Sequence, residues 1–181
     1  RFIIMGLGER EKILCVLPLF HAFAQNTCMW LPLVTGSMVI IVSCIDRTLI
    51  QNGFALKPTI FFGVPALFGL LCLMRNVQLA CVKLFISGAD MLPAKIREGF
   101  ELLYGRKICS GYGLTEASPV VAIDYENAMH AIDCVGKPMQ GIDCKILTAD
   151  GVLIIKIETT GILWIRGDNV MFGYHNAPQA N

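Results

Sequence analysis

Short apolar runs separated by turn-forming residues recur along the first part of the chain. They cover residues 12–17, 37–42, 59–64, 83–87 and 107–110, and most are bounded by Gly, Pro or Ser. Runs of this length and composition are typical of strands buried in a sheet. Three segments between them, 20–31, 47–56 and 93–104, have the length and spacing of helices. This alternation predicts an α/β fold with a mainly parallel sheet.

The strongest helical signal lies at residues 93–104. Pro93 suits a first helical turn, and Gly105 is placed to end the helix. The apolar residues of this segment at helical spacing predict a stripe that faces the sheet, formed by Ile96, Phe100 and Leu103. Its charged residues are assigned to a solvent-exposed face, namely Lys95, Arg97, Glu98 and Glu101.

The pattern changes from about residue 135. Three short apolar runs, 144–147, 153–157 and 162–166, are separated by turn sequences that contain Gly. Short strands joined by such turns predict antiparallel structure. We therefore expect an α/β subdomain over residues 1–130, carrying the functional site, and the start of a β-rich, barrel-like subdomain over residues 131–181.

Charge and hydropathy exclude some classes of function. The chain has 15 Lys and Arg residues against 14 Asp and Glu residues, a net charge of +1, so nucleic acid is not an expected partner. The hydrophobic content of 55% and the mean hydropathy of +0.60 raise the question of a membrane span. The best candidate, residues 13–34, is interrupted by prolines and by His21, Gln25 and Asn26. A strand and a helix buried in a core explain this stretch better.

The eight cysteines are scattered and form no C-x-x-C pair. A zinc site or a disulfide framework is therefore not expected. Buried, reduced cysteines indicate a cytoplasmic setting, and the first residues show no signal peptide. Peripheral association with a membrane stays open because the composition is so apolar.

The most informative segment is Ser110-Gly111-Tyr112-Gly113-Leu114-Thr115-Glu116, which directly follows a predicted strand. Ligands of α/β sheets bind at the carboxyl ends of strands. The two glycines allow the backbone to approach a ligand closely, and Tyr112 offers a flat face to a base. Thr115 supplies a hydroxyl for a phosphate oxygen, and Glu116 supplies a carboxylate for Mg²⁺. Together these residues indicate a nucleotide site.

The stretch GYGLTE resembles the signature of the adenylate-forming (AMP-binding) superfamily, which includes acyl-CoA synthetases, firefly luciferase and aryl-CoA ligases. Four further segments resemble that family and occur in its order: 18–21 (PLFH), 85–89 (FISGA), 136–141 (GKPMQG) and 161–167 (GILWIRG), the last followed by Gly173 and Tyr174. Five ordered matches are far more specific than one short motif. The chain resembles an internal part of the large domain of these enzymes.

The resemblance implies a role for each matching residue. Gly88 and Ala89 would line the adenine and acyl-carboxylate region. The nucleotide would be held on its adenine and ribose side by Ser110, Gly111, Tyr112, Gly113 and Leu114. Thr115 would contact the α-phosphate and Glu116 would hold Mg²⁺. His21 and Gln25, one helical turn apart, would lie near the acyl pocket entrance and the nucleotide.

The implied reaction is an acid–thiol ligation that uses ATP. The carboxylate attacks the α-phosphorus, pyrophosphate leaves, and a thiol of coenzyme A or of the phosphopantetheine of an acyl carrier protein displaces AMP. Such chemistry depends on positioning and charge neutralisation rather than on a protein nucleophile. The apolar composition and the PLFH segment favour a medium- or long-chain fatty acid, while aryl and amino acids stay open.

The sequence also departs from the family's pattern. The family's phosphate-binding loop, which ends in a lysine, should precede this sequence, yet residues 1–11 contain nothing like it. The T-G-D aspartate and the small C-terminal domain with its catalytic lysine should follow Tyr174. Residue 162 is Ile where the family usually has Glu. We therefore expect a chain that is truncated at both ends and inactive by itself.

Other functions match the residues less well. A serine hydrolase needs G-x-S-x-G, but neither Ser87 nor Ser110 has a glycine two residues before it. A dinucleotide-binding dehydrogenase needs a third glycine after Gly113. A non-catalytic lipid-binding or membrane-associated module stays open as the alternative, and it would not require Thr115 or Glu116. Some phenylalanines are as compatible with a core as with an acyl pocket, namely Phe20, Phe23, Phe61, Phe62 and Phe68.

Overall fold

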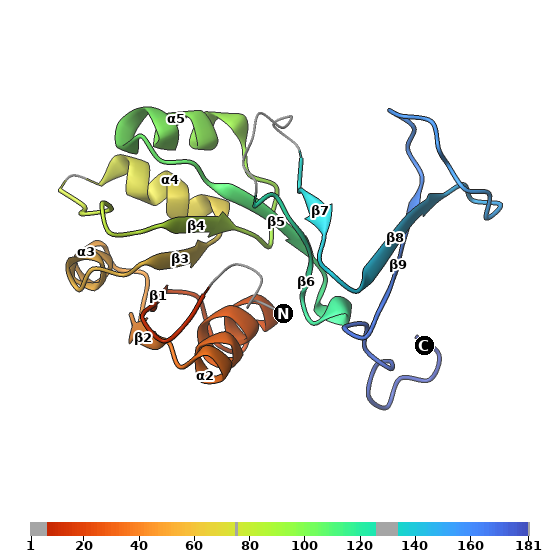
Figure 1. Cartoon of the computed structure of the whole chain (residues 1–181), viewed down its shortest axis with the longest axis horizontal. Helices are drawn as coiled ribbons and strands as arrows, with labels where there is room; N and C mark the ends of the chain where they lie inside the picture. Colours follow the sequence, from red (N-terminus) through yellow and green to blue (C-terminus); the bar gives the residue numbers. More distant parts are fainter. Residues whose placement is uncertain (1–6, 75, 126–133, 181) are drawn as a thin grey trace.

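Parallel strands form the greater part of a seven-stranded sheet in the computed structural model (Figure 1). The structure describes residues 7–74, 76–125 and 134–180. The parallel strands are β1 (Lys12–Cys15), β2 (Met38–Ile41), β3 (Ile60–Gly63), β4 (Leu84–Ser87) and β5 (Cys109–Gly113), and the antiparallel ones are β6 (Val120–Ile123) and β7 (Lys137–Pro138). They lie in the order β2-β1-β3-β4-β5-β6-β7. The predicted α/β fold with a mainly parallel sheet is confirmed.

Alternate residues of the central strands build two cores, one on each face of the sheet. In β3, Phe61 belongs to one core and Phe62 to the other. The helices on the Phe61 side are α3 (Arg47–Ala55), α4 (Pro65–Leu73) and α5 (Ala94–Tyr104), and those on the Phe62 side are α1 (Ala22–Gln25), η2 (Asn26–Trp30) and α2 (Leu31–Thr35) (Figure 1). Because both faces are covered, the strands are apolar on both sides.

Aromatic rings fill the core beneath α4 and α5. The ring centroid of Phe68 lies 5.5 Å from that of Phe61 and 5.5 Å from that of Phe100, and both contacts are edge-on. Tyr104 continues this cluster at 4.9 Å from Phe100, and its hydroxyl donates to the carbonyl oxygen of Leu71 at 2.6 Å. The predicted stripe of α5 was therefore wrong at Leu103, which is 59% exposed, because Tyr104 points to the core instead.

The helical segment that begins after His21 continues beyond the predicted end at residue 31. It widens into a π-helical turn, η2, in which the N–H of Leu31 bonds to the carbonyl oxygen of Asn26. Pro32 has no N–H to donate, so a locally widened turn accommodates it inside a continuous helix. The segment ends at Gly36, which adopts φ of +70°, a conformation that favours glycine.

Several elements are not predicted from the sequence pattern, and one predicted element does not form. The pattern predicts neither α4, which is apolar almost throughout, nor β6, nor the short strand β7. The strand predicted over residues 153–157 is wrong, because only an isolated bridge between Leu147 and Leu153 forms there. Ile155 and Ile157 are 85% and 86% exposed, so their side chains are not buried against any of the described residues.

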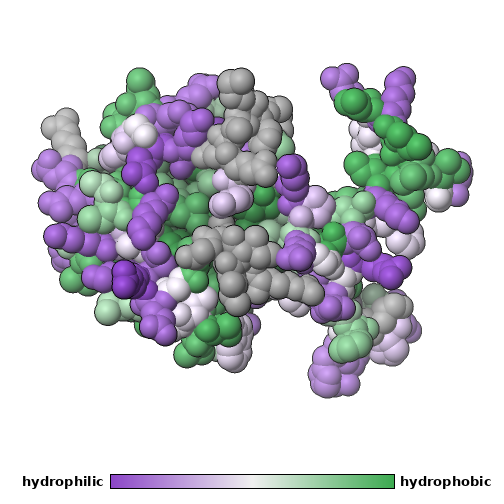
Figure 2. Space-filling model, in the orientation of Figure 1, coloured by the Kyte–Doolittle hydropathy of each residue, from purple (hydrophilic) through white to green (hydrophobic). Residues whose placement is uncertain are grey.

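The last part of the chain forms a separate two-stranded antiparallel sheet, β8 (Ile142–Leu147) with β9 (Ile162–Gly167). Figure 2 shows apolar side chains on this hairpin, which projects from the main body. The proposed subdomain boundary at residue 130 lies outside the described residues. No helix within the described ranges is long and apolar enough to cross a membrane.

Candidate active site

The 110–116 segment begins within β5 and continues into the turn that follows it, at the carboxyl end of the parallel strands. The N–H of Leu114 donates to the carbonyl oxygen of Pro119 at 2.8 Å, which draws β5 and β6 together. A Cβ at Gly113 would lie only 1.7 Å from that oxygen, whereas the nearest atoms to a Cβ at Gly111 would be 3.5 Å away. Gly113 is therefore required by the fold, while Gly111 could carry a Cβ at ordinary contact distance.

An apolar cavity of about 270 Å³ lies against this turn. It is on the face of the sheet that carries Phe62, whose ring meets that of Phe23 edge-on at 6.1 Å. Its wall is formed by His21, Phe23, Thr27, Phe62, Ile86, Gly88, Ala89, the segment 111–116, Pro119, Val120 and Ile123. Of the five phenylalanines, Phe23 and Phe62 line this cavity, Phe61 and Phe68 belong to the opposite core, and Phe20 is exposed.

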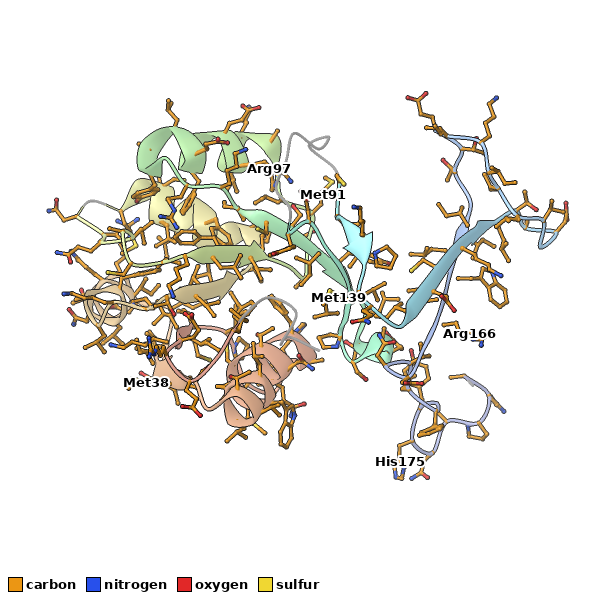
Figure 3. The ribbon with its side chains drawn as sticks, viewed as in Figure 1. Met38, Met91, Arg97, Met139, Arg166 and His175 are labelled. Carbon is orange, nitrogen blue, oxygen red and sulfur yellow. The ribbon has the colours of Figure 1, made fainter. Side chains whose placement is uncertain are left out.

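A second cavity, of about 380 Å³, lies on the other face of the same strand ends, beside α5. The Nη2 of Arg97 donates to the Oγ of Ser110 at 2.7 Å. The Oγ of Ser87 is buried and has no hydrogen-bond partner among the described residues, and both serines line the cavity. Figure 3 shows Arg97 and Met91, which also line it, beside each other at this end of the sheet.

Four residues line both cavities: Ala89, Gly111, Tyr112 and Gly113. The two cavities therefore share a wall at the ends of β4 and β5.

His21 lies at the N-terminus of α1 rather than inside a helix. Its Nδ1 accepts from the backbone N–H of Phe23 at 3.2 Å, so in the neutral ring the proton is on Nε2. His21 lines the apolar cavity, where such an N–H is a hydrogen-bond donor. Gln25 is exposed and is not among the residues that line either cavity.

Thr115 and Glu116 lie in a 3₁₀ turn, η3 (Thr115–Ala117), at the wall of the apolar cavity. The hydroxyl of Tyr174 donates to the Oε1 of Glu116. This hydrogen bond lowers the pKa of the Glu116 carboxyl and raises the pKa of the Tyr174 phenol, because it stabilises the carboxylate and uses the phenolic proton.

The residues present are compatible with a Mg²⁺ ion that arrives with a nucleotide. Within the described ranges, no three His, Cys, Asp or Glu side chains are grouped to hold a metal. Mg²⁺ is commonly held by one or two carboxylates together with substrate phosphates. Glu116 alone, partly exposed at the cavity wall, matches that pattern and does not match a metal centre built only from protein ligands.

The sequence matches the family described as AMP-binding enzyme over residues 2–175. The chain belongs to this family.

Among curated relatives, the long-chain-fatty-acid–CoA ligase of Haemophilus influenzae is 33% identical over 181 residues, which cover 96% of this chain and 32% of that protein. The 4-coumarate–CoA ligase 2 of Solanum tuberosum is 30% identical over 182 residues, 94% of this chain and 33% of that protein. The structure of apo MatB from Rhodopseudomonas palustris superposes with a TM-score of 0.90 at 20% identity, covering 98% of this chain and 36% of that chain.

Membership of the AMP-binding enzyme family confirms the resemblance drawn from the five segments. The departure at Ile162 does not interrupt the match, which extends to residue 175. The chain spans about a third of the length of the curated relatives it matches, for example 32% of the Haemophilus influenzae ligase. The names of these relatives include both fatty-acid and 4-coumarate ligases, so family membership does not determine the acid.

Several residues in and around the candidate site were not predicted from the sequence. Arg97 was assigned to a solvent-exposed face and is instead half-buried and bonded to Ser110. Tyr174 was part of a matching segment but had no role. Phe23 and Phe62 were not separated from the core phenylalanines, although alternation along β3 distinguishes Phe62 from Phe61. No local signal could have paired Tyr174 with Glu116, which are 58 residues apart.

Proposed function

We propose that the protein to which this chain belongs activates a carboxylic acid with ATP and then transfers the acyl group to a thiol. The observation that carries this proposal is the pair of cavities that share Gly111–Gly113 as a wall. The cavity lined by Phe23 and Phe62 suits the tail of an acid, and the second cavity, where Arg97, Ser87 and Ser110 offer polar atoms, suits a purine base. A carboxylate would meet the α-phosphorus beside this shared wall.

On the nucleotide side, Tyr112 would stack on the base. The hydroxyl of Ser87 would hydrogen-bond with the edge of the base, and that of Ser110, which accepts from Arg97, would still donate its own hydrogen. Gly88 and Ala89 would line the region where base and acyl carboxylate approach. Leu114 and Thr115 would follow the ribose and α-phosphate, and Glu116 would hold Mg²⁺. Gln25 does not line either cavity. Its proposed place near the nucleotide is based on the family resemblance alone.

On the acid side, the wall is apolar and aromatic, which supports a medium- or long-chain fatty acid. The cavity volume of about 270 Å³ is just below the roughly 300–1,000 Å³ of complete ligand pockets. It would therefore hold the carboxyl end of a long acid, while the remaining chain extends beyond the described wall. The Nε2–H of His21 would donate to a polar atom at the entrance.

The proposed reaction requires little chemistry from the protein side chains themselves. The acid is already ionised at neutral pH, so no protein base has to remove a proton before it attacks phosphorus. The shared wall would hold the two reactants in contact, which is the main source of acceleration in such transfers. The hydroxyl of Thr115 would donate a hydrogen bond to a phosphate oxygen. When bound, Mg²⁺ would neutralise phosphate charge.

We also propose that residues 1–130 and 131–181 belong to different subdomains of a larger adenylating domain. The phosphate-binding loop and the catalytic lysine would come from other parts of the complete protein, so this chain alone would not complete the reaction. The acceptor would be coenzyme A or the phosphopantetheine of an acyl carrier protein. A cytoplasmic setting is compatible with the eight free cysteines, and peripheral membrane association is left as a question for experiment.

Acid-dependent exchange of pyrophosphate into ATP tests the proposal. The complete protein is assayed with acetate, benzoate, several amino acids and fatty acids of increasing length, and the 181-residue chain is assayed beside it. We expect exchange in the complete protein with medium- or long-chain fatty acids and none with the isolated chain. Exchange only with benzoate would contradict the fatty-acid proposal. No exchange with any acid would contradict adenylation and favour a non-catalytic lipid-binding or membrane-associated module.

A further inference from the structure

The segment that follows β9 is fastened to the turn that carries Thr115 and Glu116. The N–H of Met171 donates to the carbonyl oxygen of Glu116 at 2.8 Å. The Nδ2 of Asn169 donates to the carbonyl oxygen of Ala117 at 2.7 Å. These two bonds hold the backbone of the turn from the side of the β8–β9 hairpin.

A third bond from the same segment holds a side chain. The hydroxyl of Tyr174 donates to the Oε1 of Glu116, and Tyr174 is itself 45% exposed. Glu116 is also partly exposed, so packing does not determine the direction of its carboxylate. A long, exposed side chain samples many rotamers and loses that freedom when it binds a ligand. The bond from Tyr174 removes much of this freedom in advance.

We propose that Tyr174 is a positioning residue that sets the direction of the Glu116 carboxylate for the metal–nucleotide complex. This inference rests on the proposed function. One phenolic O–H uses one acceptor site of a carboxylate that has about four, so the bond is compatible with coordination of a cation. Hydrogen bonds from neighbouring groups commonly orient carboxylates that bind metals. Asn169 and Met171 explain how a residue 58 positions away is kept in place.

Binding of Mn²⁺, which replaces Mg²⁺ and is visible by electron paramagnetic resonance, tests the inference without turnover. The complete protein is titrated with Mn²⁺ in the presence of α,β-methylene-ATP, an unreactive nucleotide. We expect Tyr174→Phe, which keeps the ring and removes the donor, to weaken Mn²⁺ binding by about tenfold. Tyr125→Phe is the matched control, because Tyr125 is 53% exposed and does not line either cavity. It should bind Mn²⁺ as the unchanged protein does.

Glu116→Gln separates failure of the inference from failure of the proposed function. If Glu116→Gln weakens Mn²⁺ binding and Tyr174→Phe does not, the positioning role is wrong and the metal role of Glu116 stands. If neither change has an effect, the proposed metal site is itself wrong. In the double variant we expect no further loss from Tyr174→Phe, because Tyr174 acts through Glu116.

An additional loss of affinity in the double variant would overturn the inference, because it would mean that Tyr174 affects the metal by another route. Circular dichroism and thermal unfolding of each variant establish that the fold is retained. Should Tyr174→Phe not fold, Tyr174→Leu serves as the second donor-free variant. Its expected loss is the same, and unchanged Mn²⁺ binding would overturn the inference equally.

Discussion

Arg97 on α5 and Ser110 on β5 are joined by a hydrogen bond of 2.7 Å between Nη2 and Oγ. The bond connects the helix layer to the strand end that lines both cavities. Ser110 is only 8% exposed, and the Nε of Arg97 is buried without a partner among the described residues. The bond therefore holds a cationic side chain at the wall of the second cavity.

Ser110→Ala should leave the Arg97 guanidinium without this acceptor. Because an unsatisfied buried donor costs about 1–3 kcal/mol, we expect the free energy of unfolding to fall by that order and ATP binding to weaken. Urea denaturation and equilibrium dialysis with ATP measure the two effects. Ser118→Ala is the control, since Ser118 is exposed. Equal stability and equal ATP affinity for Ser110→Ala would show that the bond contributes nothing.

The two glycines at the end of β5, Gly111 and Gly113, should respond differently to alanine. Gly113→Ala forces a Cβ against the Pro119 carbonyl oxygen, 1.7 Å away before any shift, so the turn must move. We expect a loss of at least about 1–3 kcal/mol in the free energy of unfolding. Gly111→Ala should fold normally, since its Cβ meets ordinary contact distances of 3.5 Å, and should reduce ATP binding by entering the cavities. Thermal unfolding and ATP binding distinguish the two, and similar behaviour of both variants would contradict this prediction.

Phe100→Ala should destabilise the α5 side of the sheet strongly. Phe100 is 0% exposed and contacts the rings of Phe68, Phe85 and Tyr104. Removal of a buried phenylalanine ring costs about 3–5 kcal/mol. Leu102→Ala on the same helix, at 87% exposure, should change stability by no more than about 0.5 kcal/mol. Chemical denaturation of both variants checks the difference.

Acidification should remove a stabilising contribution from Glu11. Burial acts to raise the pKa of Glu11, but hydrogen bonds from Thr59 and Lys83 and the charge of Lys83 outweigh it and lower the pKa below 4.5. The Nζ of Lys83 lies 3.0 Å from the Oε1 of Glu11. Because the unfolded carboxyl takes up its proton first, this stability is present above the unfolded pKa and is lost as the pH falls through the folded pKa.

We therefore expect the free energy of unfolding to fall less steeply for Glu11→Gln than for the unchanged protein when the pH is lowered below about 4.5. Urea denaturation at several pH values, from neutral to acidic, measures this slope. Parallel pH profiles would show that Glu11 and Lys83 do not contribute through ionisation.

His21→Ala should change the preference among acids more than the exchange reaction as a whole. The side chain lines the apolar cavity, and its Nδ1 is already occupied by the N–H of Phe23, so only the other end of the ring is available to a ligand. Pyrophosphate exchange with fatty acids of different lengths measures the preference. An equal loss for every acid would place His21 on the nucleotide side instead.

The sequence by itself determined the class of the fold and pointed to the 110–116 segment as the candidate site. Both depend on local patterns: apolar runs of strand length, helical spacing, and glycines at the end of a strand. It also placed the chain in its family, because five separate segments occur in one order. Because the central strands are buried on both faces, their apolar runs were recognisable in the sequence. The same runs did not show which of Phe61 and Phe62 faces the cavity, which depends on the elements that pack on each face.

The tertiary structure alone decided which distant residues meet. Arginine is a residue type expected at the surface, and only the packing of α5 against β5 brings Arg97 to its partner Ser110. Tyr174 reaches Glu116 because the segment after β9 returns to η3, a contact between residues 58 positions apart. The run at 153–157 has strand composition but lacks a neighbouring strand among the described residues. Pairing depends on what lies beside a segment in space, and no pattern within the segment contains that information.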